Sequence, residues 1–313
     1  MKGRGKSIFS AYRQVVRRRV QFFQRCLSVC LAVCVAYLLW YRWDSREIER
    51  KNQELQAIAA QAEAPGADEA DAEASGVEKE KKGADADDPA QDGGRDSENA
   101  EEKRSGFMAG FEQLVRINPD LKGWISIPGT VLSLPVVQGS DNSYYLDHDF
   151  YGKQDRHGTI YADCEADLEA GGFNTVIYGH HMRDGSMFGI LKEYRSEAFY
   201  KEHPSFFISL PEEEREYEIL AVVRNDIFEG NSEAFQYYDY KQISNEEDFA
   251  YYCQVLKENA VYDTGVEATN GDELVTLCTC DYGSKDQRLL VVGRKKTGGT
   301  GGENGRAKEA GGL

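Results

Sequence analysis

One apolar run near the amino end limits how this 313-residue chain can be organised. Residues 26–41 carry no charge and read Cys-Leu-Ser-Val-Cys-Leu-Ala-Val-Cys-Val-Ala-Tyr-Leu-Leu-Trp-Tyr. A membrane-spanning helix needs about 20 apolar residues, so this run is long enough only if Arg25 and Arg42 extend their charges to the membrane surfaces. Tyrosines and tryptophans gather at its far end, as they do at membrane interfaces. We therefore expect a transmembrane signal-anchor over 26–43.

The alternative is a secretory signal peptide that is cleaved. Its basic region, residues 1–25, would be unusually long, and no small-x-small cleavage site closely follows the apolar run. The basic flank comes before the run and an acidic region after it, which predicts a cytoplasmic amino end. We expect a retained single-pass anchor in the cell membrane, with everything after Trp43 outside the cell.

The rest of the chain divides by composition. Residues 44–105 begin with good helix formers and continue as a stretch of Ala, Gly, Asp, Glu and Lys, which predicts a helical stalk followed by an acidic, disordered tether. Residues 297–313 are Gly-rich and should not fold. The span 106–296 remains as one domain of ordinary size. The net charge of −17 lies largely in the tether, so it describes solubility and spacing more than a substrate.

Short apolar runs separated by turn residues predict a mainly β domain, a barrel or a sandwich. A helix is expected at 107–117, and a longer one at 244–260, with Ser244 and Glu247 as its capping box. That helix has one apolar stripe, which includes Cys253. The expected strands are Trp124–Ile127, Pro135–Gln138, Thr159–Ala162, Thr175–Tyr178, Phe206–Leu210, Tyr217–Val223, Glu273–Thr279 and Leu289–Val292.

The seven cysteines do not form a disulfide framework. Three of them lie in the apolar run, and the domain holds the other four, Cys164, Cys253, Cys278 and Cys280. A domain of this size with so few cysteines does not depend on disulfides. Cys253 is explained by core packing, and at least one other thiol is available for chemistry.

Cys280 and Arg288 are the strongest pair of candidate catalytic residues. Cys280 ends one expected strand, and Arg288 begins the next after a seven-residue polar loop. An antiparallel hairpin would place the two residues on neighbouring strands about 5 Å apart. A guanidinium favours the thiolate and stabilises the oxyanion that develops during acyl transfer.

Acyl transfer by a thiol also needs a group that moves protons. His180 and His181 follow the apolar run 174–178, where a buried strand opens into a loop. Neighbouring side chains of extended backbone point in opposite directions, so one of the two faces Cys280, and spacing alone does not say which. His148, His157 and His203 lie in polar sequence and are expected at the surface.

Two motifs resemble those of class B sortases. Tyr178-Gly-His-His-Met-x-Asp-Gly-Ser-Met-Phe188 is similar to their histidine motif, and Thr276-Leu-Cys-Thr-Cys280 followed by Arg288 is similar to their Thr-Leu-x-Thr-Cys…Arg motif. The segments near 117–146 also agree with that family, and the resemblance covers 107–296. It implies a closed barrel of about eight strands and a cysteine transpeptidase, with His180, directly after Tyr-Gly, as the catalytic histidine.

The resemblance further implies a reaction in two halves. Cys280 would cleave the C-terminal sorting signal of a secreted protein to give a thioacyl enzyme, and a peptidoglycan precursor amine would resolve it. His180 would move the protons and Arg288 would hold the carbonyl, without a metal or another cofactor. The candidate substrate-binding residues are their neighbours, Thr279, Cys278, Tyr282 and His181.

Cys278 departs from the family, which usually has a small hydroxyl residue there. The Cα atoms of Cys278 and Cys280 on one strand would lie about 6.5–7 Å apart, at or beyond the disulfide limit, so two free thiols are expected.

Other functions have weaker support. The two histidines with Cys278 and Cys280 do not have the usual zinc spacing. A non-enzymatic adhesin, a pilin-polymerising sortase and an L,D-transpeptidase-like enzyme are further alternatives, although the last lacks its His-Gly-Cys setting here. No P-loop, dinucleotide-binding glycine pattern or basic stripe for nucleic acid is present in the sequence.

Overall fold

The computed structural model describes residues 4–61, 107–226, 237–240, 245–280 and 287–296. For 4–20, 61, 225, 226, 238, 239 and 280 it describes the backbone alone. The chain divides into two compact units, Met1–Gln53 and Glu54–Leu313.

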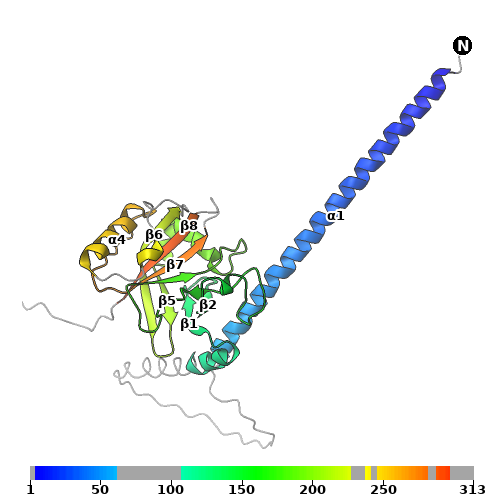
Figure 1. The fold of residues 1–313 in the computed structure, drawn as a ribbon. Coiled ribbons are helices and arrows are strands. Elements are labelled where there is room, and N and C mark those ends of the chain that lie inside the picture. The colour runs from blue at the N-terminus through cyan, green and yellow to red at the C-terminus, as the bar shows by residue number, and fades with distance from the viewer. Residues whose placement is uncertain (1–3, 62–106, 227–236, 241–244, 281–286, 297–313) are drawn as a thin grey trace, which may run out of the picture. The chain divides into compact units, whose positions relative to one another are not determined.

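Helix α1 (Arg4–Gln61) accounts for the described part of the first unit and continues into the second (Figure 1). Its segment Gln21–Ala60 is long and apolar enough to cross a membrane, by length and composition. The large apolar side chains in its 22–43 part lie mostly exposed, Leu31 at 64% and Val33 at 62% among them. Side chains of this kind are stable in lipid, so the predicted span is a candidate membrane helix.

Eight strands form a closed barrel in the order β1-β2-β3-β4-β7-β8-β6-β5. All eight strands expected from the sequence are present, and most are longer than predicted. Their bounds are β1 Leu121–Ser126, β2 Ser133–Val137, β3 Tyr161–Ala162, β4 Asn174–Tyr178, β5 Ser205–Ser209, β6 Glu214–Asp226, β7 Leu274–Cys280 and β8 Gln287–Lys295. Two neighbouring pairs are parallel, β2 with β3 and β4 with β7.

Short helices connect the strands. Residues 107–117 are helical, as predicted, and lead into β1. The others are η1 Tyr144–Leu146, η2 Phe188–Arg195, α3 Glu197–Glu202, η3 Tyr237–Tyr240 and α4 Glu246–Glu258.

Helix α4 covers one face of β4, β6, β7 and β8 (Figure 1). Its stripe is the predicted one, with Phe249, Tyr252 and Leu256 buried and Cys253 partly buried against the same cluster. The predicted cap is wrong, because Asn245 and not Ser244 caps the helix. Asn245 has extended backbone, and its side chain accepts a hydrogen bond from the backbone N–H of Asp248.

The last turns of α1 pack into the barrel unit. Leu55 is 3% exposed in a cluster with Phe111 and Leu114 of the 107–117 helix. A Cβ atom on Gly110 would lie 2.7 Å from the Ile58 carbonyl oxygen, so the close approach of the two helices requires glycine there. The barrel unit therefore includes residues 54–61, which we predicted from the sequence to belong to a stalk.

Candidate active site

The end of β4 and the end of β7 lie side by side. The two strands are parallel, with Tyr178 opposite Cys278. The pairing continues past β4, because the Gly179 N–H donates to the Cys278 carbonyl at 3.2 Å and the Thr279 hydroxyl donates to the Gly179 carbonyl at 2.7 Å. The next residues along each strand are His180 and Cys280, so the register brings both to the same edge of the barrel.

The antiparallel pair of β7 and β8 adds Arg288 to this edge. Cys280 and Arg288 are direct partners in the ladder, as the hairpin argument predicted. Arg288 is partly buried, and its guanidinium Nη1 donates to the Gln287 carbonyl at 3.3 Å. Three strand ends thus bring together the three residues predicted to carry the chemistry.

His180 and His181 have different surroundings. His180 is partly exposed, and its Nε2 lies 2.7 Å from the carbonyl oxygen of Leu146, in η1. A carbonyl only accepts hydrogen bonds, so Nε2 carries the proton and Nδ1 is the basic nitrogen of the neutral ring. His181 is 6% exposed and pairs with Met187 in a short bridge. Accessibility therefore favours His180 for proton transfer.

The turn after His180 fixes its backbone. The Phe188 N–H donates to the His180 carbonyl at 3.0 Å, and Met187 has the left-handed φ of 50°. A Cβ on Gly179 would lie 2.6 Å from the Phe188 ring. Glycine at 179 therefore lets Phe188 pack directly over the backbone that leads to His180.

The candidate substrate-binding residues that the structure describes are packed within the protein. Thr279 is 2% exposed, with its hydroxyl on the Gly179 carbonyl, and Cys278 is 2% exposed. Tyr282 lies outside the described residues. Thr279 and Cys278 are buried next to the strand ends, and substrate contacts remain a prediction for all four residues.

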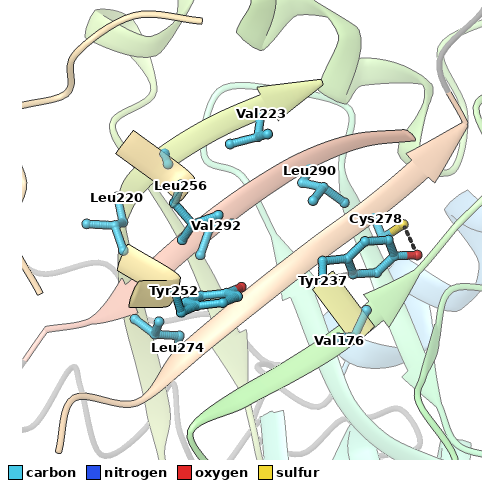
Figure 2. Packing of buried hydrophobic residues seen from close by; sticks show 11 residues of the cluster. Val176, Leu220, Val223, Tyr237, Tyr252, Leu256, Leu274, Cys278, Leu290 and Val292 are labelled. Carbon is cyan, nitrogen blue, oxygen red and sulfur yellow. Dashed lines mark hydrogen bonds between the residues drawn. The ribbon is translucent and has the colours of Figure 1, made fainter. Parts of the chain in front are cut away.

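Cys278 is a free thiol, as predicted, and its hydrogen-bond partner could not be selected from the sequence. Its Sγ–H donates to the Tyr237 hydroxyl at 3.2 Å (Figure 2). Burial and the neighbouring Cys278 raise the pKa of Tyr237, so its hydroxyl stays protonated. Tyr237 belongs to η3, between β6 and α4, and sequence spacing does not relate it to the strand ends.

One histidine prediction is wrong. His157 is 2% exposed rather than at the surface, because its Nδ1 lies 2.7 Å from the Asp155 carboxylate. A hydrogen-bonded imidazole can be buried at little cost, and polar neighbours in the sequence do not reveal such a bond. His148 and His203 are partly exposed.

The described residues contain no group of three or more His, Cys, Asp and Glu side chains arranged to hold a metal ion. The backbone register places Cys280, His180 and Arg288 at the same edge of the barrel, at or next to the ends of three adjacent strands. A cysteine, a histidine and an arginine are the residue types that thiol acyl transfer uses, so these three are the candidate catalytic residues.

Comparison with known proteins assigns the family. A family model for the sortase domain matches residues 125–296. The chain belongs to the sortase family. It is therefore a cysteine transpeptidase, and sortases are associated with the cell surface.

The relatives and solved structures support class B, as the sequence motifs predicted. Sortase B of Listeria monocytogenes is 36% identical over 190 residues, which are 60% of this chain and 74% of that protein. Sortase B of Staphylococcus aureus is 32% identical over 186 residues, 59% of this chain and 73% of that protein.

Among solved structures, a mutant form of Clostridium perfringens sortase B matches with a TM-score of 0.58 and 29% identity, over 63% of this chain and 92% of that one. A Staphylococcus aureus sortase B-substrate complex matches with a TM-score of 0.54 and 30% identity, over 60% of this chain and 84% of that one. The closed eight-stranded barrel is the sortase fold.

Proposed function

We propose that this sortase cleaves the C-terminal sorting signal of secreted proteins and that Cys280 is its nucleophile. The observation that supports this assignment is the register at the barrel edge. Cys280 pairs with Arg288 in the β7–β8 ladder, and Thr279, the residue before Cys280, donates a hydrogen bond to the Gly179 carbonyl. A related enzyme has been solved as a sortase B-substrate complex, which supports a peptide substrate for this chain as well.

In the first half of the reaction, the Cys280 thiolate attacks the carbonyl carbon of the scissile peptide bond. Arg288 stabilises the oxyanion that forms. His180 protonates the departing amine, the C–N bond breaks, and the acyl group remains on sulfur as a thioester.

In the second half, a peptidoglycan precursor amine attacks the thioester. His180 accepts the proton of the incoming amine, the new C–N bond forms, and the thiolate of Cys280 is released. Because the Leu146 carbonyl occupies Nε2–H, we assign both proton transfers to Nδ1 of His180.

We further propose that the protein is a single-pass membrane protein with a cytoplasmic amino end. The apolar segment of α1 and the basic residues before it support this topology. The barrel would then lie outside the cell, where secreted substrates and wall precursors meet.

The assignment is tested by cleavage of a sorting-peptide library with the purified enzyme and four variants. We expect Cys280→Ala, His180→Ala and Arg288→Ala to abolish turnover, and His181→Ala to keep part of it. Mass spectrometry should detect the thioacyl adduct on the peptide that contains Cys280. Turnover by Cys280→Ala would refute the nucleophile, and equal loss from both histidine variants would refute the choice of His180.

A further inference from the structure

Asp163 is a buried carboxylate to which the reaction above gives no role. It directly follows β3, and it is 0% exposed. Its Oδ2 accepts hydrogen bonds from the Asn142 amide at 3.0 Å and from the Tyr178 hydroxyl at 3.1 Å, and its Oδ1 accepts one from the Glu165 N–H at 3.1 Å. A carboxylate removed from water is tolerated because such donors replace the water.

The two side-chain partners of Asp163 belong to the two segments that hold His180. Tyr178 ends β4, two residues before His180. Asn142 precedes η1, which contains Leu146, and the Leu146 carbonyl lies 2.7 Å from Nε2 of His180. One carboxylate thus joins the strand that supplies the histidine to the loop that orients its ring.

Asn142 is held by further bonds. Its side-chain oxygen accepts from the Cys164 N–H at 2.8 Å, and its backbone carbonyl accepts from the Tyr161 hydroxyl at 3.0 Å. The Asp163 carboxylate is therefore one part of a fixed connection between β3 and the loop that carries Leu146. Loss of the Oδ2 acceptor would leave two donors, from Asn142 and Tyr178, without the oxygen that they share.

We propose that Asp163 is a positioning residue for catalysis, which holds the Leu146 carbonyl against His180 through Asn142 and Tyr178. This inference rests on the proposed catalytic role of His180. Asp163 touches no reacting atom. Its effect is to keep the His180 proton on Nε2, so that Nδ1 remains the nitrogen that exchanges protons.

The test uses Asp163→Asn in the full-length enzyme, a change of nearly equal volume that replaces one acceptor oxygen with a donor. Two measurements are made well below the unfolding temperature. Peptide-cleavage kinetics give kcat and KM, and the ¹⁵N shifts of the His180 ring report its tautomer. We expect kcat to fall about 10- to 100-fold with a smaller change in KM, since small misplacements of a catalytic group have effects of this size. The His180 signals should lose their Nε2–H character.

Tyr178→Phe is the second variant, because it removes one hydroxyl and keeps the ring. We expect a smaller fall in kcat and a similar direction of change in the ¹⁵N shifts. In the Asp163→Asn background it should add little, because both changes break the same connection. If Asp163→Asn does not fold, Tyr178→Phe still decides the question through the ¹⁵N shifts.

Glu273→Gln is the matched control. Glu273 lies at the other end of the β4–β7 pair, where it accepts hydrogen bonds from Arg215 at 3.1 Å and Tyr217 at 2.5 Å. The Glu273→Gln variant should have a lower unfolding temperature but unchanged kcat and His180 shifts. If folded Asp163→Asn has the wild-type kcat and wild-type His180 shifts, the proposal is refuted. In that case an inactive His180→Ala would still support the proposed function. An active His180→Ala would instead refute that function.

Discussion

At the scale of single residues, Cys253 shows how the fold keeps a thiol unreactive. It lies on α4, partly buried against the barrel cluster, and burial raises its pKa to about 11. The thiolate is the reactive form, so at pH 8 roughly one molecule in a thousand carries it at this position.

We therefore predict that alkylation of Cys253 by iodoacetamide accelerates about tenfold per pH unit from pH 7.5 to 10, without a plateau. Peptide mapping by mass spectrometry measures the rate, and Cys253→Ser identifies the peptide. Cys278, 2% exposed, should remain unlabelled in the same samples. A rate that levels off by pH 9 would contradict the raised pKa.

The candidate catalytic residues differ in how far the sequence determines their positions. Cys280 and Arg288 are separated by only seven residues in the sequence, so a hairpin predicts their pairing, and the register is the predicted one. His180 lies about 100 residues earlier, and its place depends on the parallel pairing of β4 with β7. Such a non-local contact leaves no spacing signal, so motif resemblance supplied the histidine. The hydrogen bonds from Asn142 and Tyr178 to Asp163 also could not be predicted from the sequence, for the same reason.

At the scale of elements, turn residues and alternation predicted each strand because they act locally. The prediction of the helix cap was wrong because serine and asparagine are both good capping residues, and the extended backbone at Asn245 makes that residue the cap. The order of the strands could not be predicted from the sequence, because it follows from packing across the barrel. What α4 contributes to that packing is a buried hydrogen-bond group. Tyr252 receives a bond from Asn174 at 3.0 Å and lies 3.5 Å from the Thr276 hydroxyl.

Tyr252→Phe should lower the free energy of unfolding by about 1–2 kcal/mol, because it leaves the buried Asn174 amide without this acceptor. Chemical denaturation of the enzyme measures the change. Tyr251→Phe is the control, since Tyr251 is the preceding residue on α4 and is 53% exposed. Equal stability of the two variants would mean that the buried bond contributes nothing net.

The end of α1 makes a similar contribution to the barrel unit. Leu55 is buried against Phe111 and Leu114, so Leu55→Ala should lower the free energy of unfolding by about 2–5 kcal/mol. Glu54→Ala, at an exposed neighbouring position, should change it little. Thermal unfolding compares them, and a wild-type midpoint for Leu55→Ala would show that this turn is dispensable.

At the scale of the whole molecule, α1 contributes residues to both compact units, and its side chains have different surroundings in each. Its segment in the first unit exposes apolar side chains, and its last turns supply Leu55 to the barrel unit. A soluble form should therefore begin at Glu54 and not at residue 106, because a chain that starts at 106 lacks Leu55.

Phase separation in Triton X-114 tests the role of the apolar segment. We predict that the full chain enters the detergent phase, because a helix of about 20 apolar residues is far more stable in a micelle than in water. The chain that begins at Glu54 should stay in the aqueous phase and cleave sorting peptides at the wild-type rate, since it keeps the barrel and Leu55. Partition of the full chain into the aqueous phase would contradict a membrane helix. Detergent partition of the shortened chain would instead place the membrane-binding surface on the barrel unit.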